Sequence, residues 1–190
     1  KGLLELRGEW LPAEDVRKKR GEWANAWEIE GAHFSVRSNR GLGPARSVLA
    51  RAEEVNAAFL RDVMGVVDAA PFPKKLVVLD FASLDDLDGH IRDTHQGGTA
   101  PKGVPGFYTP GEAVHLTVLP EGSALTREEV VLHECTHAAF DVRRTSMPWY
   151  HDETAAYVAC MWFVADHDRP LAQATRALDY PRLGYWKTRA

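Results

Sequence analysis

The stretch TREEVVLHECTHAAFDV, residues 126–142, decides which fold the sequence predicts. Thr126 and Glu129 have the T-x-x-E spacing of a capping box, in which each side chain accepts a hydrogen bond from the other residue's backbone N–H. An apolar run follows at once, so we expect a partly buried helix that begins after Thr126. His133 and His137 are four residues apart in this helix, which places both imidazoles on one face, one turn apart.

Residues 133–137 read His-Glu-Cys-Thr-His, which is the pattern H-E-x-x-H. Two histidines at this spacing on a helix can direct their ring nitrogens at one metal ion. Glu134 follows the first histidine, so its carboxylate lies beside the ion, where it can accept a proton from a bound water. We therefore expect a metal site at His133 and His137, with Glu134 as catalytic base. The alternative is a pair of solvated histidines on a helix face.

A third metal ligand is expected shortly after this helix. A catalytic zinc has three protein ligands and one open position. Residues 147–159, MPWYHDETAAYVA, contain a proline and a tryptophan that favour a turn, followed by three candidate ligands at the start of the next helix. These candidates are His151, Asp152 and Glu153, and the spacing leaves all three open.

An H-E-x-x-H helix followed by a turn, a tryptophan, an acidic residue and a helix containing Ala-Tyr resembles the gluzincin branch of the zinc metallopeptidases. The sequence is most similar to short bacterial domains in which a strand reading G-F-Y precedes the motif helix. Gly106-Phe107-Tyr108 fits that strand, and HFSVRSN at residues 33–39 resembles their first strand. The resemblance covers residues 32–165, and its specific part is residues 133–157.

This resemblance implies an α+β fold of the zincin type. A small mixed sheet with an edge strand over the cleft would pack on the H-E-x-x-H helix and on a following helix that carries the glutamate ligand. The implied metal is Zn²⁺, bound by His133, His137 and Glu153. Alignment on Trp149 instead places the acidic ligand at Asp152.

The resemblance also implies an activity, the hydrolysis of peptide bonds by Glu134-assisted attack of a zinc-bound water, with a peptide or protein as substrate. In such folds a substrate pairs with the edge strand. We predict that residues 114–119 form this strand, with His115 or Thr117 facing the substrate. Two other functions stay open, a zinc hydrolase acting on a non-peptide amide and a non-catalytic binding module with the zincin fold. Glu134 favours an enzyme, because a purely structural zinc site has no use for that carboxylate.

The remaining elements follow from periodicity, caps and turns, and their order is that of an α+β protein. We predict a half-buried strand, a long amphipathic helix, a central strand, a helix capped by Ser83, two strands joined by the turn Thr-Pro-Gly-Glu, the motif helix and a final helix. In that order they span residues 33–38, 44–68, 76–81, 84–95, 107–108 and 114–119, the motif helix from residue 127, and 153–166.

The 190 residues suit one domain, and we expect an N-terminal arm (residues 1–31) followed by the zincin-like catalytic domain (residues 32–190). The net charge of −4 argues against a nucleic-acid partner, and no apolar run is long enough for a transmembrane segment. Two cysteines do not make a disulfide scaffold. Because the chain begins at Lys1, we expect it to derive from a longer precursor, and export of that precursor is left open.

Overall fold

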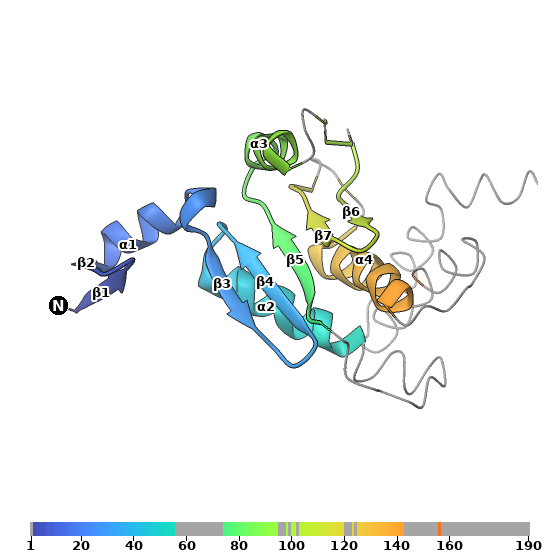
Figure 1. Ribbon diagram of the computed structural model, residues 1–190, viewed down its shortest axis with the longest axis horizontal. Helices are drawn as coiled ribbons and strands as arrows, with labels where there is room; N and C mark the ends of the chain where they lie inside the picture. Colours follow the sequence, from blue (N-terminus) through green and yellow to red (C-terminus); the bar gives the residue numbers. More distant parts are fainter. Residues whose placement is uncertain are drawn as a thin grey trace, which may run out of the picture.

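The computed structural model describes residues 2–55, 74–94, 98, 100, 101, 103–119, 123, 125–142 and 156. The centre of the described fold is a mixed sheet of five strands (Figure 1). In spatial order the strands are β3 (Trp27–Glu30), β4 (Phe34–Ser38), β5 (Leu76–Asp80), β7 (Ala113–Leu116) and β6 (Gly106–Thr109). Helices pack on both faces, so the predicted α+β class is confirmed at this level.

The strand directions define the two edges of the described sheet. Strands β4, β5 and β7 are parallel, whereas β3 is antiparallel to β4 and β6 is antiparallel to β7. The predicted central strand, β5, is indeed central, as its continuous apolar sequence LVVLD requires. The prediction of an edge strand at residues 114–119 is wrong. Strand β7 pairs with β5 on one side and β6 on the other and is buried throughout, and the edge strands among the described residues are β6 and β3.

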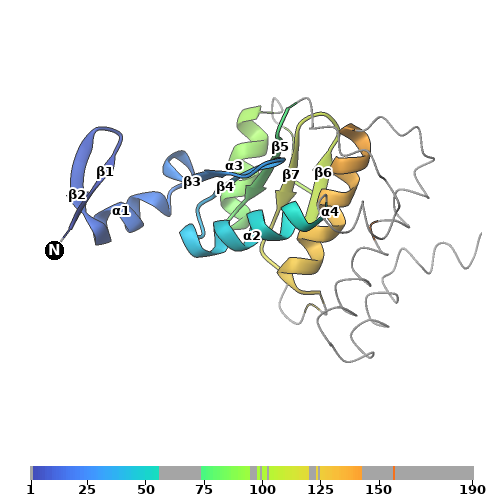
Figure 2. The same cartoon turned by 90° about the horizontal axis from the view of Figure 1, so that it is seen from below.

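Helices α2 (Leu42–Glu54) and α4 (Arg127–Val142) cover one face of the sheet, and α3 (Leu84–Thr94) lies on the other (Figure 2). The first face holds the larger core, where apolar residues of β4, β5 and β7 meet those of the two helices. The second face holds a smaller core around Phe81 and Leu87. The motif helix α4 packs directly against β6 and β7, which places it under the edge of the sheet.

Three local predictions are confirmed by hydrogen bonds. Ser83 Oγ accepts from the backbone N–H of Asp86 at 3.1 Å, which caps α3. In the capping box of α4, the N–H of Thr126 donates to Glu129 Oε2 at 2.6 Å, and the N–H of Glu129 donates to Thr126 Oγ1 at 3.3 Å. The turn between β6 and β7 closes with a 3.0 Å bond from the N–H of residue 112 to the carbonyl of residue 109, with Gly111 at φ 75°.

Helix α2 begins at Leu42, two residues before the predicted start at Pro44. The described part of this helical segment ends at residue 55, so the rest of the predicted helix, residues 56–68, lies outside the described residues. The predicted final helix at residues 153–166 lies outside them too, apart from Ala156, which is helical and fully buried. No helix among the described residues is both long and apolar enough to cross a membrane.

The N-terminal segment, residues 2–31, contains regular secondary structure. Strands β1 (Leu3–Leu6) and β2 (Glu9–Pro12) form a hairpin, and α1 (Ala13–Arg20) follows Pro12 directly. A 3-10 turn (Trp23–Asn25) then leads into β3, a strand of the main sheet that the sequence analysis placed in the arm.

Two of the three tryptophans in this segment attach it to the sheet. The ring centroid of Trp23 lies 4.1 Å from that of Phe81, and Trp27 belongs to β3 itself. Trp10 lies on the hairpin and is 65% exposed, so it takes no part in this attachment.

Candidate metal centre

Helix α4 brings the two motif histidines together. The Nε2 atoms of His133 and His137 lie 3.1 Å apart, and their ring planes meet at 78° with centroids 4.8 Å apart. Both side chains are half-buried, whereas the residues between them, from Glu134 to Thr136, are buried. The i, i+4 spacing therefore produces the convergence of ring nitrogens that the sequence predicts.

This nitrogen pair fits the geometry of a zinc site. Tetrahedral zinc, with Zn–N bonds of about 2.0–2.1 Å, holds two nitrogens about 3.3 Å apart, close to the 3.1 Å between the two Nε2 atoms. Among the described residues, no group of three His, Cys, Asp or Glu side chains is placed to hold a metal. The candidate third ligands His151, Asp152 and Glu153 lie outside the described residues.

Glu134 lies between α4 and the edge strand, and only 9% of its surface is exposed. A Cβ atom at Gly106 of β6 would approach Glu134 Cγ to 3.1 Å and Val130 Cγ1 to 2.7 Å. Glycine at this position is what lets the helix approach the strand so closely. The Glu134 side chain thus packs against β6 one position along the helix from the first histidine.

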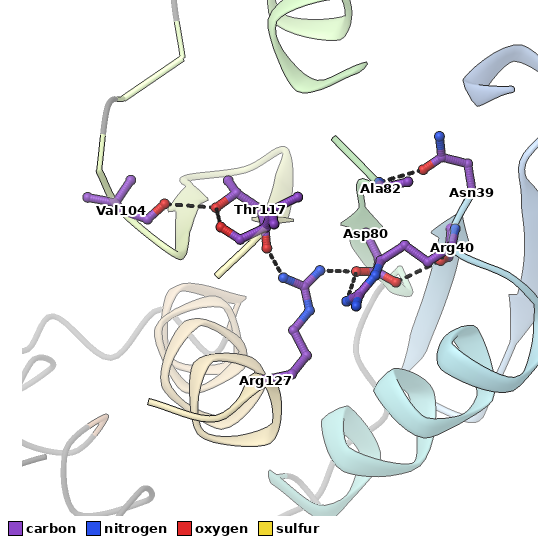
Figure 3. A network of polar contacts seen from close by, with 9 residues as sticks. Asn39, Arg40, Asp80, Ala82, Val104, Thr117 and Arg127 are labelled. Carbon is purple, nitrogen blue, oxygen red and sulfur yellow. Dashed lines mark hydrogen bonds and ion pairs between the residues drawn. The ribbon is translucent and has the colours of Figure 1, made fainter. Parts of the chain in front are cut away.

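The N-terminal end of α4 is fixed to the sheet by a buried charge network (Figure 3). The Arg127 guanidinium donates to Asp80 Oδ1 at the end of β5 and to the backbone carbonyl of Thr117. Ser38 Oγ donates to the other Asp80 oxygen at 2.6 Å, and Arg40 lies 3.7 Å from the carboxylate. Burial lowers the pKa of Arg127, and the Asp80 charge opposes that shift. Asp80 is fully buried, so this pair is held by mutual charge and hydrogen bonding.

The C-terminal end of α4 is fixed to the strand pair β6–β7. Tyr108 of β6 donates its hydroxyl to Asp141 Oδ2 at 2.5 Å, and the N–H of Gly111 in the β6–β7 turn donates to the same oxygen at 3.2 Å. The helix that carries both histidines and Glu134 is therefore anchored at both ends to the same side of the sheet. Such anchoring restricts the positions of the His133, Glu134 and His137 side chains.

Cys135 lies within the motif on the core face of α4 and is a free, fully buried thiol. Burial raises the pKa of this thiol well above its usual value, and the charges of Glu134 and Glu53 raise it further. A protonated, buried thiol is neither a ligand nor a nucleophile. The second cysteine, Cys160, lies outside the described residues.

The expectation that His115 or Thr117 faces a substrate is wrong. Both residues are 1% exposed. The His115 ring stacks on Phe107 with centroids 4.5 Å apart and an angle of 8°, and Thr117 Oγ1 donates to the carbonyl of Val104 at 2.8 Å. His115 is buried because β7 is an interior strand, and Thr117 is buried because the chain just after β7 is hydrogen-bonded to residues 104 and 105.

Sequence reasoning missed the residues that anchor the motif helix. Asp80 carried a signal, since a carboxylate that ends an apolar strand needs a buried partner. No sequence pattern linked it to Arg127, or Tyr108 to Asp141, because these pairs are 47 and 33 residues apart.

Comparison with known proteins found no family model, no curated protein and no solved structure that matches the chain. The chemistry of the site therefore has to follow from its own residues and their geometry.

Proposed function

We propose that this protein is a zinc-dependent metallopeptidase with a zincin-like fold. His133, His137 and Glu153 would hold Zn²⁺, and Glu134 would act as the catalytic base. The observation that carries the proposal is the 3.1 Å approach of the two Nε2 atoms on a helix whose buried glutamate packs against the edge strand. A mixed sheet whose edge strand β6 packs on this helix also supports the proposal.

In the proposed reaction, the metal and Glu134 have different chemical roles. Bound zinc lowers the pKa of water and polarises a carbonyl group. Glu134 accepts the proton of the attacking water and passes it to the leaving amine. Its packing between α4 and β6 restricts its side chain, so little conformational freedom is lost when it acts.

A peptide is the favoured substrate because of the edge strand. Among the described strands, β6 has a neighbour on one side only, which is β7. Its other side can pair with an extended chain through backbone hydrogen bonds. Strand β6 also packs on α4, so a chain paired there would run past the helix that carries Glu134.

Hydrolysis of a quenched fluorescent peptide library by the zinc-loaded protein tests this proposal. We expect cleavage that a chelator stops and added zinc restores. Glu134→Gln should retain zinc and reduce the cleavage rate by about 10²- to 10⁴-fold, because general-base assistance is lost. Glu128→Gln, on the first turn of the same helix, is the matched control and should cleave normally.

Two results would contradict the peptidase proposal. Stoichiometric zinc with no cleavage of any peptide would favour a non-catalytic binding module. Cleavage restricted to non-peptide amides would favour the alternative zinc hydrolase.

A further inference from the structure

A cavity of about 470 Å³ lies at the start of α2, between the C-terminal end of α1 and the loop that follows β4. This volume is within the range of small-molecule sites in proteins. The elements that line the cavity, the end of α1 and the start of α2, lie on the β3 side of the sheet, whereas α4 lies on the β6 side (Figure 2). It is therefore separate from the candidate metal centre.

Three arginines line this cavity, and none of its lining residues in the described part of the chain is acidic. Arg20 is held in place, since its Nη1 donates to the carbonyls of Asn25 and Ala26 at 3.2 and 2.9 Å. Arg40 lies 3.7 Å from Asp80, but that carboxylate is already hydrogen-bonded to Arg127. Arg17 is exposed at the rim. Three positive charges around one cavity, in a chain of net charge −4, produce a local positive potential that favours an anionic ligand.

The first turn of α2 adds to this positive field. The helix begins at Leu42 in the cavity wall, and its first turn has no acidic residue and no side-chain cap. The backbone N–H groups of Leu42 and Gly43 in this first turn have no intrahelical partner and attract anions, whereas Pro44 has no N–H. The residue before it, Gly41, has φ 121°, a conformation that favours glycine and turns the chain from β4 into the helix.

The wall of the cavity is fixed and partly aromatic. Asn39 is 4% exposed, and its side-chain amide donates to the carbonyl of Gly21 at 2.9 Å, which ties the loop after β4 to the end of α1. Trp27 also lines the cavity, with the Arg20 guanidinium 4.8 Å from its ring centroid. The cavity thus combines cationic groups, which orient an anion, with an apolar surface, as small-ligand sites do.

We propose that this cavity binds a small organic anion. Its phosphate or carboxylate group would lie among Arg17, Arg20, Arg40 and the first turn of α2, and its apolar part would lie against Trp27. This site does not depend on the proposed metal chemistry, so either proposal can fail without the other.

Calorimetric titration of the full chain with inorganic phosphate, and separately with succinate, tests the proposal at constant ionic strength set with sodium chloride. We expect saturable binding of at least one of the two anions. Arg17→Gln and Arg40→Gln should each weaken binding about tenfold, since each removes a charged hydrogen-bond donor. Arg46→Gln, on an exposed position of α2 outside the cavity, is the matched control and should bind as the wild type does.

The two probes also distinguish the sources of the anionic group. Tighter phosphate binding would indicate a phosphorylated ligand, and tighter succinate binding would indicate a carboxylate. Absence of saturable binding by both anions would overturn the proposal, as would equal loss in Arg46→Gln and Arg17→Gln. Arg17 is exposed, so the fold of its variant is not at risk.

Discussion

Gly106 determines how closely the motif helix approaches the edge strand. A Cβ at this position would lie 2.7 Å from Val130 Cγ1. We expect Gly106→Ala to lower the free energy of unfolding by about 1–3 kcal/mol, as overpacking of a well-packed core does. Equilibrium unfolding in urea measures this change.

The matched control for this variant is Gly43→Ala on α2, where an added Cβ meets nothing within 4 Å. Gly43 is exposed in the first turn of α2, so this substitution should change the free energy of unfolding by less than about 0.5 kcal/mol. An unchanged stability of Gly106→Ala would contradict the close approach of α4 and β6.

Glu53 links α2 to the turn between β3 and β4. Its Oε1 accepts the backbone N–H groups of His33 and Phe34 at 2.8 and 3.0 Å, and its Oε2 lies 2.7 Å from His33 Nδ1. Burial alone raises the pKa of Glu53, but these hydrogen bonds and the His33 charge lower it below its ordinary value of 4.5. A carboxyl with a lowered pKa stabilises the fold above pH 4.5, and this contribution is lost as the pH falls through the lowered value.

We therefore expect Glu53→Gln to lower the free energy of unfolding more at pH 7 than at about pH 3. Urea unfolding of both proteins at the two pH values measures the difference. The control is Glu28→Gln on β3, whose carboxylate is exposed and contributes little at either pH. An equal loss for Glu53→Gln at both pH values would show that its charge does not stabilise the fold.

At the scale of elements, the position of α4 depends on an ion pair buried at the end of β5. Asp80 is fully buried, and Arg127 loses its charge partner if that carboxylate is removed. We expect Asp80→Asn to lower the free energy of unfolding by about 3–5 kcal/mol, because a buried charge without its partner is costly. Thermal or urea unfolding measures this, with Asp88→Asn on the exposed side of α3 as the control.

A loss below about 0.5 kcal/mol for Asp80→Asn, which is typical of exposed positions, would contradict the role of this pair as an anchor. The same variant should also bind zinc less tightly if the anchor positions the histidines. Zinc affinity thus distinguishes a change in the positions of the histidines from a loss of stability alone.

The helix caps could be predicted from the sequence, but the order of the strands in the sheet could not. Ser83, Thr126 and Glu129 cap their helices as their spacing indicates, because a cap involves residues only three positions apart. Strand β7 was expected at the edge, yet it lies inside the sheet, because strand order depends on pairing between distant segments. Strand β3 was overlooked, although its sequence WEIE alternates as its burial does.

At the scale of the whole molecule, the local features of the candidate site could be predicted from the sequence, and its contacts between distant segments could not. The convergence of His133 and His137 follows from helical geometry and could be predicted. The contacts that fix α4 at Asp80 and Tyr108 bring together distant parts of the chain, so only the structure reveals them. Glu153 as third ligand stays a prediction, as it lies outside the described residues.

The sheet also separates two chemically different ends of the molecule. The motif helix α4 lies on the β6 side, and the end of α1 and the start of α2 lie on the β3 side (Figures 1 and 2). Helix α4 carries the two histidines and the buried glutamate, whereas α1 and the start of α2 line the arginine-containing cavity. The two proposed sites share β5 and the Asp80 network between them, where Arg40 and Arg127 approach the same carboxylate (Figure 3).

The zinc content of the purified full chain, measured by elemental mass spectrometry after zinc loading and removal of free metal, tests the central claim most directly. The account predicts one zinc per chain, lost in His133→Ala, His137→Ala and Glu153→Ala and retained in Asp152→Ala. His90→Gln, on the opposite face of the sheet, should retain zinc as the matched histidine control. Less than a stoichiometric amount of zinc in the wild type, or full zinc in the His133 and His137 variants, would contradict the account.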